Sequence, residues 1–276
     1  MATTRFVKMH GLGNDFVVVD TRGADFPVDA ARARAIADRR RGIGCDQLIL
    51  IAPPRAGGDV LMRILNADGG EVAACGNATR CVAALLLGET GGERVIVETA
   101  AGRLEARAAA GAAIAVDMGE PRLAWQDIPL AAAQDTLHVA LALGPLGDPV
   151  CTSMGNPHAT FFVPDALAVD LAALGPPLER HPLFPERANI GIAQILAPDR
   201  LRLRVWERGA GITPACGTGA CAALVAAQRR GLAGRRAEIV LDGGTLDVEW
   251  RGDGHVVMTG PVATSFSGSF EPERLG

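Results

Sequence analysis

The 276-residue chain contains no tyrosine and only one lysine, Lys8, so the other 26 of its 27 basic residues are arginines. Enzymes that use pyridoxal phosphate hold it as a Schiff base on a lysine, and Lys8 is the only residue that could serve. The chain also lacks an apolar run of about 18 residues, the length that crosses a bilayer. Its first residues do not show the basic and then apolar segments of a secretory signal. We therefore expect a cytoplasmic protein with reduced thiols.

Charge of one sign is not in large excess. The 27 basic and 31 acidic residues give a net charge of −4, which argues against a broad surface for nucleic acid or anionic membrane. Hydrophobic residues make up 49% of the chain and charged residues 21%, so a sizeable core is expected and wholesale disorder is not. The length fits one large domain or two smaller ones.

Short, apolar, β-branched runs outnumber the helical stretches. Strands are predicted over 16–19, 48–51, 95–97, 201–206 and 255–258. Helices are predicted over 29–40, 77–87, 165–174 and 218–230. Because the two kinds of element do not alternate regularly, the sequence favours an α+β fold with mixed or antiparallel sheets over a doubly wound one. We expect a domain connection near 117–121.

An internal repeat is the most informative feature of the sequence. Gly-Asn-Asp-Phe at 13–16 is echoed by Gly-Asn-Pro-His at 155–158, and Ala-Cys-Gly-Asn at 74–77 is echoed by Ala-Cys-Gly-Thr at 215–218. Three positions keep their spacing: Asn14, Gln47 and Cys75 in the first half, Asn156, Asn189 and Cys216 in the second. The first two lie 33 residues apart in both halves, and the first and third lie 61 and 60 residues apart. The repeat predicts two homologous halves related by a pseudo-twofold axis.

Each repeat places a Cys-Gly-polar turn at the start of a predicted helix. Free N–H groups at a helix N-terminus bind anions and favour a thiolate, so we expect the pKa of Cys75 and Cys216 to lie below the free value of about 8.5. The glycine after each cysteine lets a ligand approach the backbone closely. Two such turns facing one another would offer two thiols and two anion-binding helix ends around one point.

Other interpretations of the cysteines stay open at this point. Burial as a small apolar side chain is the commonest fate of a free cysteine. We assign it to four of the six: Cys45, Cys151, Cys81 and Cys221. A zinc site would have to combine Cys75 and Cys216 with the helical cysteines at spacings that differ from the usual knuckle, so no metal is predicted. A redox disulfide between Cys75 and Cys216 would lack a C-x-x-C context.

The remaining interpretation is a pair of acid–base thiols on either side of one carbon. One thiolate removes a proton while the opposite thiol delivers one to the other face, which inverts a stereocentre without a cofactor. We therefore predict that Cys75 and Cys216 are catalytic and that no cofactor is needed.

Polar side chains that could line a pocket recur around the cysteines. Amide side chains occur at six positions: Asn14, Gln47, Asn66, Asn77, Asn156 and Asn189. Singly each could be a turn residue, but four occupy repeat-related positions, so several are expected to converge on one pocket. Glu207 and Arg208 follow a predicted strand, where Arg208 could pair with a carboxylate and Glu207 with an ammonium of an amino acid.

With these residues the chain resembles the diaminopimelate epimerase family, cofactor-independent isomerases of lysine biosynthesis, nearly end to end. The segments that carry the resemblance are KMHGLGNDF (8–16), GIGCDQL (42–48), NADGGEVAACGNATRC (66–81), MGNPHATFFV (154–163), HPLFPERANI (181–190) and ERGAGITPACGTGACAA (207–223). The double cysteine motif, with GNDF and GNPH, is specific to that family.

The resemblance implies a fold and a place for the site. Two similar domains, each a mixed sheet or barrel curled around a central helix, would enclose the active site in the cleft between them. The first domain would take residues 1–117 and recover the C-terminal segment 263–276, and the second would take 118–262. The family also implies a homodimer, with diaminopimelate as its small-molecule substrate.

The resemblance further implies roles for single residues in the conversion of LL- to meso-diaminopimelate. Cys75 would donate a proton and Cys216 would accept one, with the roles exchanged in reverse. The helix N-termini at Gly76-Asn77 and Gly217-Thr218 would hold the reacting α-carboxylate and stabilise the developing charge. The distal L-centre would be held by a set of polar side chains: Asn66, Asn156, Asn189, Glu207 and Arg208, with Asn14 and Gln47 completing the pocket.

Four further positions carry expectations. His158 would lie near the first thiol, although a packed strand histidine is the other interpretation. The sequence departs from the family pattern at Ala78, which matters if that position needs a positive φ, and at Ile212, where a polar contact of the usual glutamate is lost. Phe266 stands where the family often has a tyrosine at the dimer interface, which keeps the packing but removes a hydroxyl.

Two competing functions use the same residues differently. A proline racemase or hydroxyproline epimerase would act on a small cyclic substrate that needs no distal clamp, so Glu207, Arg208 and the asparagines favour the longer diamino diacid. A non-enzymatic thiol redox or zinc-binding protein would leave the paired asparagines without a purpose.

Overall fold

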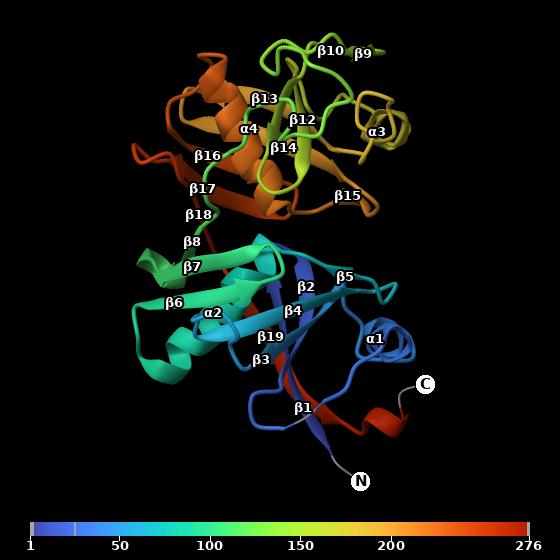
Figure 1. The fold of residues 1–276 in the computed structure, drawn as a ribbon, viewed down its shortest axis with the longest axis vertical. Helices are drawn as coiled ribbons and strands as arrows, with labels where there is room; N and C mark the ends of the chain where they lie inside the picture. The colour runs from blue at the N-terminus through green and yellow to red at the C-terminus, as the bar shows by residue number, and fades with distance from the viewer. Residues whose placement is uncertain (1–2, 25, 275–276) are drawn as a thin grey trace. The chain divides into compact units, whose positions relative to one another are not determined.

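The computed structural model describes residues 3–24 and 26–274. Residues 1–2, 25 and 275–276, which all belong to the predicted first domain, lie outside the described residues. The chain divides into two compact units (Figure 1). Unit 1 comprises the residues up to Val116 together with those from Gly260 onward, and unit 2 comprises Asp117–Thr259. Among the described residues, no helix is long and apolar enough to cross a membrane.

Unit 1 is mostly strand, with two α-helices inserted between strands. Its elements in chain order are β1 (Thr4–Gly11), β2 (Asn14–Asp20), α1 (Ala30–Ala37), β3 (Gln47–Ala52), β4 (Val60–Asn66), β5 (Glu71–Val72), α2 (Gly76–Thr90), β6 (Arg94–Thr99), β7 (Gly102–Ala108), η1 (Ala110–Ala112), β8 (Ile114–Asp117), β19 (Ala263–Phe270) and η2 (Pro272–Arg274). β2 runs parallel to β3 and β4 runs parallel to β6, whereas β1 is antiparallel to both β2 and β19.

Helices cover both faces of the strands in unit 1. Val17 and Leu48 pack with Ile36 of α1, whereas the alternating neighbours Val18 and Ile49 point to the opposite face. α2 contacts β1, β2, β6 and β7 and is buried along most of its length. A helix that is buried on nearly all sides lies in the interior, so the sheet of unit 1 curls around α2. Burial on both faces explains why β2 and β3 read as continuous apolar runs.

Unit 2 repeats this plan. Its elements are β9 (Ala142–Leu143), β10 (Leu146–Gly147), β11 (Val150–Ser153), β12 (Pro157–Phe162), α3 (Leu171–Glu179), β13 (Asn189–Ala197), β14 (Arg200–Glu207), β15 (Gly211–Thr213), α4 (Gly217–Arg229), β16 (Arg236–Leu241), β17 (Gly244–Trp250) and β18 (Val256–Gly260). β12 is parallel to β13 and β14 is parallel to β16, as for the corresponding strands of unit 1. α4 is buried along most of its length, like α2.

The register of the parallel strands is also repeated. Phe16 pairs with Gln47 across β2 and β3, and His158 pairs with Asn189 across β12 and β13. Phe16 and His158 each lie two residues after the asparagine of their Gly-Asn turn. The predicted α+β class and the internal duplication are therefore confirmed at the level of topology.

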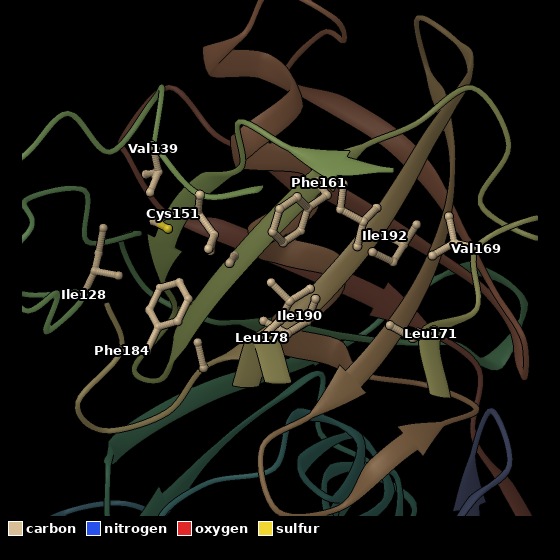
Figure 2. Close-up of a cluster of buried hydrophobic side chains, with 14 of the residues drawn as sticks. Ile128, Val139, Cys151, Phe161, Val169, Leu171, Leu178, Phe184, Ile190 and Ile192 are labelled. Atoms are coloured by element: carbon tan, nitrogen blue, oxygen red, sulfur yellow. The ribbon is translucent and has the colours of Figure 1, made fainter. Parts of the chain in front are cut away.

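One apolar cluster of unit 2 joins α3 and the strands β12 and β13 to buried side chains from residues 128–151. Figure 2 shows Phe161 of β12, Ile190 and Ile192 of β13, and Leu178 of α3 gathered in this cluster. Cys151 of β11 is fully buried among these side chains, in the structural role predicted for it.

One predicted helix is displaced. The helix expected over 165–174 begins instead at Leu171 and ends at Glu179. The Asp165 carboxylate accepts a hydrogen bond from the Leu167 N–H (2.8 Å) and holds a local turn, whereas the Asp170 carboxylate caps the helix by accepting from the Ala173 N–H (3.1 Å). The predicted bounds were therefore wrong by six residues at the start and five at the end, because Asp170 and not Asp165 caps the helix.

The helix predicted over 29–40 ends at Ala37, and the turn that follows carries the chain to the site. The Gly44 N–H donates back to the Ile36 carbonyl at 3.0 Å. A Cβ on Gly42 would lie 2.0 Å from the Ala35 carbonyl oxygen, so only glycine fits there. Gly44 adopts a positive φ of 81° and leads into Asp46, the residue before β3.

Candidate active site

In unit 1, Cys75 occupies the N-cap position of α2. Its backbone is extended (φ −148°, ψ 110°), and its carbonyl accepts hydrogen bonds from the N–H and the hydroxyl of Thr79 at 2.9 and 3.0 Å. These bonds fix the first turn of the helix and leave the half-buried thiol at its start. The predicted placement of Cys75 at a helix N-terminus is thus observed.

Two asparagines lie beside this thiol. Asn14, at the tip of the β1–β2 hairpin, has its Oδ1 atom 3.9 Å from Cys75 Sγ. The same oxygen accepts a hydrogen bond from Asn77 Nδ2 at 3.2 Å. Segments far apart in the sequence therefore bring Asn14, Cys75 and Asn77 together as predicted from their spacing.

Gln47 and Asn66 form a second amide pair in unit 1. They are register partners across β3 and β4, and Gln47 Nε2 donates to Asn66 Oδ1 at 2.8 Å. Asn14 begins β2, Gln47 begins the parallel strand β3 and Asn66 ends the antiparallel strand β4, so all three lie at one edge of the sheet. Gln47 Oε1 is buried and has no hydrogen-bond partner among the residues that the structure describes.

In unit 2, Cys216 occupies the equivalent N-cap of α4 but has a different neighbour. Its thiol donates to Glu207 Oε2 at 3.1 Å, and its Sγ lies 3.7 Å from the Thr218 hydroxyl. The Thr213 hydroxyl donates to the other carboxylate oxygen of Glu207 at 2.5 Å. Glu207 was predicted to bind an ammonium group; in this structure it contacts the second thiol.

Burial dominates the acidity of Cys216. The residue is only 3% exposed, and this burial, followed by the charge of the Glu207 carboxylate, raises the pKa of Cys216 well above its ordinary value. Hydrogen bonds from Thr218 and from the Gly219 backbone lower it, but by less. The expectation that the helix N-terminus lowers this pKa is therefore wrong for Cys216, because the desolvation of a thiolate outweighs the helix-end field.

The polar residues of unit 2 form a chain of hydrogen bonds around His158. Asn156 Nδ2 donates to the Thr218 hydroxyl at 3.3 Å, and Asn156 Oδ1 lies 3.0 Å from His158 Nε2. Asn189 Nδ2 lies 3.4 Å from the same ring nitrogen, and Asn189 Oδ1 accepts from the Arg208 N–H at 2.8 Å. The predicted residues of the second half thus assemble, and His158 lies at their centre.

His158 is buried and uncharged. Burial, together with the nearby positive charge of Arg208, lowers the pKa of His158 to about 3. Within unit 2 the ring is a packed strand histidine that lies beside two amides, and its predicted proximity to the first thiol stays a prediction.

Arg208 lines a cavity of about 300 Å³ in unit 2 together with Asn156 and Arg122. Its guanidinium Nη1 donates to the Glu186 carbonyl at 2.9 Å. The two guanidinium groups and the amide of Asn156 are donors suited to a carboxylate, and the lining also includes the acidic residues Asp127 and Glu186.

One supporting residue could not be identified from the sequence: Glu179 at the end of α3. This buried carboxylate accepts hydrogen bonds from Trp206 Nε1 at 2.7 Å and from the Gly209 N–H at 3.1 Å. Glu179 therefore holds Trp206 and Gly209, the residues on either side of Glu207 and Arg208. No motif distinguishes Glu179 from a surface acid, so only the fold could have revealed it.

The four cysteines predicted to be structural are buried: Cys45, Cys81, Cys151 and Cys221. Burial raises the pKa of Cys45 to about 11 and the pKa of Cys81 and of Cys151 to about 12. All six cysteines are free thiols, and the part of the chain that the structure describes holds no cluster of three metal-binding side chains.

The three departures from the family pattern are all accommodated. Ala78 lies in the first turns of α2 without a positive φ, so the alanine is unstrained. Ile212 is partly exposed and pairs in register with Trp206. Phe266 is 50% exposed and packs edge-on against Phe6, with 5.9 Å between ring centroids.

Solved structures share this fold over nearly the whole chain. A predicted epimerase from Pseudomonas aeruginosa covers 97% of this chain and 99% of its own, with a TM-score of 0.70 at 19% identity. A hydroxyproline epimerase from Agrobacterium vitis covers 100% of this chain and 94% of its own, with a TM-score of 0.69 at 19% identity. The fold is therefore the duplicated α+β fold found among amino-acid epimerases.

Sequence comparison narrows this class. The family described as diaminopimelate epimerase matches residues 6–124 and 150–265. A diaminopimelate epimerase of Rhodospirillum centenum is 64% identical over 98% of this chain and 94% of its own. One of Acidiphilium cryptum is 60% identical over 100% of this chain and 99% of its own. The chain belongs to the diaminopimelate epimerase family.

The contact between Glu207 and Cys216 predicts the effect of Glu207→Gln. Removing the negative charge should make the thiolate easier to form, so the pH midpoint for alkylation of Cys216 should fall by about one unit. The alkylation rate of Cys216 is measured by mass spectrometry of the peptide that contains it. Glu249→Gln removes an equal charge from an exposed position of unit 2 and should leave the midpoint unchanged. An unchanged midpoint in Glu207→Gln would contradict the assigned coupling.

The buried neutral ring of His158 predicts a loss of stability in acid. Because its folded pKa lies below the unfolded value of about 6.5, its contribution is complete above that pH and falls as pH drops towards about 3. Between about pH 7 and about pH 4.5 the loss is about 2.5 kcal/mol.

Urea denaturation of His158→Asn should show a smaller pH-dependent loss of stability than the unsubstituted protein, by about that amount. Equal pH dependence in His158→Asn and the unsubstituted protein would show that the ring is charged in the folded state.

Proposed function

We propose that this protein inverts one α-carbon of 2,6-diaminopimelate, converting the LL isomer to the meso isomer in lysine biosynthesis. The observation that carries the proposal is the duplicated helix start with a thiol, one in each unit, in a chain of this family. The protein is an isomerase that needs only its own thiols for the proton transfers, and we propose that it works in the cytoplasm, where thiols stay reduced.

The two half-sites are proposed to close on one substrate, with one thiol on each face of the α-carbon. In the LL-to-meso direction Cys216 removes the α-proton and Cys75 delivers a proton to the opposite face. Each thiol lies next to a helix N-terminus, at Gly76-Asn77 or Gly217-Thr218. The N–H groups of these helix ends would stabilise the charge that builds on the α-carboxylate.

The Glu207 carboxylate gives Cys216 a route to the thiolate. Its Oε2 atom is already the acceptor of the thiol hydrogen at 3.1 Å. A transfer of that proton to Glu207 leaves a thiolate and a neutral carboxyl group, so no net charge is created in the buried site. We propose that this transfer accompanies substrate binding, since the free thiol is protonated at neutral pH.

The distal amino-acid end is proposed to bind along the amide edges of both units. Arg208 would pair with its carboxylate, and Asn156 and Asn189 would hold it from unit 2. Asn66 and Gln47 would complete the pocket from unit 1, where the buried Gln47 Oε1 atom is available for a donor. A two-ended substrate is favoured because a cyclic imino acid would leave these groups without a partner.

Exchange of solvent deuterium tests this function. The purified protein in reductant, without added cofactor, should incorporate deuterium at the α-positions of LL- and meso-diaminopimelate. Cys75→Ala and Cys216→Ala should each lower the rate of inversion on the order of a thousandfold or more, because each removes one of the two acid–base groups.

Cys151→Ala provides the matched control, because its buried thiol lies in the apolar cluster of unit 2 and takes no part in the proposed reaction. Proline and hydroxyproline are assayed in parallel. Exchange into either of those with none into diaminopimelate would refute the substrate assignment, and near-normal turnover in Cys75→Ala or Cys216→Ala would refute the two-thiol mechanism.

We also propose that the working protein is a homodimer formed through β19 of unit 1. The residues from Thr264 to Ser269 are exposed and uncharged, and Phe266 is the large exposed apolar side chain among the described residues of this unit. Phe6, Phe26 and Phe270 form an aromatic group with it. An uncharged exposed strand with an aromatic anchor is suited to pairing with a second copy.

Phe266→Arg tests the dimer. Introducing a charge and removing the aromatic contact should weaken association by about thirtyfold or more, measured by sedimentation equilibrium. Leu196→Arg changes a side chain of unit 2 that is equally exposed, at 47%, and should leave association unchanged. A protein that sediments as a monomer at micromolar concentration before substitution would refute the proposed dimer.

A further inference from the structure

Four charged side chains of unit 1 form a network that adjoins Asn14: Lys8, Asp15, Arg39 and Asp46. Lys8, only 7% exposed, donates through Nζ to Asp15 Oδ2 at 2.5 Å and to the carbonyl of Gly44. Arg39 Nη2 donates to Asp15 Oδ1 and to Asp46 Oδ1, both at 2.7 Å. Two positive charges thus balance two negative ones.

The network holds both carboxylates in fixed positions. Burial by itself would raise the pKa of Asp15, but hydrogen bonds from Arg39 and Lys8 hold it well below its ordinary value. The Asp46 N–H donates to Asp15 Oδ1 at 3.0 Å, and the Asp15 N–H donates to Asp46 Oδ2 at 3.1 Å. These reciprocal bonds join the start of β2 to the turn before β3.

Asp46 determines which way the Asn14 amide points. Its Oδ2 atom accepts a hydrogen bond from Asn14 Nδ2 at 3.0 Å. A carboxylate paired with an arginine can only accept, so the nitrogen of the amide must face Asp46. The amide oxygen therefore faces the other way, towards Cys75 Sγ at 3.9 Å and Asn77 Nδ2 at 3.2 Å.

We propose that Asp46 is a positioning residue for the first thiol. By orienting the Asn14 amide, it presents an acceptor to the hydrogen of Cys75 and keeps the resting side chain a thiol. The proposal deepens the proposed function and rests on it, since a proton donor must hold its proton until the α-carbon becomes a carbanion. The rest of the network, including the single lysine of the chain, holds Asp46 in place.

The experiment measures alkylation of Cys75 by iodoacetamide as a function of pH, with the Cys75 peptide quantified by mass spectrometry. In Asp46→Ala the Asn14 amide is free to turn and present its N–H to the sulfur, which favours the thiolate. The pH midpoint should fall by about half a unit, and the rate below the midpoint should rise about threefold.

Asp38→Ala is the matched control. It removes the same charge from the turn after α1, but its carboxylate accepts from the N–H groups of Arg40 and Arg41. Its midpoint should equal that of the unsubstituted protein. An equal shift in Asp38→Ala would show that general loss of charge or of folding causes the effect, and would overturn the proposal.

A double substitution separates orientation from direct charge effects. Asn14→Ala removes the acceptor itself and should lower the midpoint by a similar amount. Adding Asp46→Ala to Asn14→Ala should then cause no further shift, because Asp46 acts through Asn14. A further shift as large as in the single variant, or no shift in Asp46→Ala alone, would overturn the proposal.

The alkylation needs no substrate, so it reports on Asp46 even if the protein fails to exchange diaminopimelate. Failed exchange with the expected alkylation shifts would refute the proposed function and leave the thiol orientation standing. Normal exchange without those shifts would do the reverse.

Discussion

The parallel pairing of β2 with β3, and of β12 with β13, is the constraint on which each half-site depends. Parallel strands start at the same edge of a sheet, so a residue at the start of one meets a residue at the start of the other. That register brings Gln47 opposite Phe16, and Asn189 opposite His158. The buried helix of each unit has its cysteine at the N-cap. In unit 1 this cysteine lies beside Asn14, and in unit 2 Asn156 bonds to Thr218 in the first turn of the helix.

The duplicated half-sites share a backbone plan but differ in the chemistry offered to the thiol. Cys75 has the amide oxygen of Asn14 as its acceptor, whereas Cys216 has the carboxylate of Glu207. An amide oxygen cannot take the proton at neutral pH, but a carboxylate can. In the proposed reaction, the duplication would supply the symmetry that inversion of a carbon requires, and the different acceptors would let the two thiols begin in unequal roles.

Much of this arrangement could be predicted from the sequence, because it follows from local patterns and spacing. Equal spacings in the two halves predicted the repeat, and the Cys-Gly turns predicted the helix starts. The acidity of Cys216 could not be predicted, because it depends on competition between two effects of unequal size. The field of a helix end contributes about 0.3–1 kcal/mol at exposed sites, which is less than about one pKa unit. Complete burial shifts a pKa by up to about 3–5 units. The contacts of Asp46 and Glu179 likewise join segments that only the fold brings together.

The burial of Lys8 has a practical consequence. Reagents that acylate amines have one lysine side chain to react with in this chain, and it is closed off by Asp15 and by the carbonyl of Gly44. Lys8 can be modified only when the strands and the turn around it separate. The labelling rate of this one amine therefore measures how often the first half-site opens in solution, without any introduced probe.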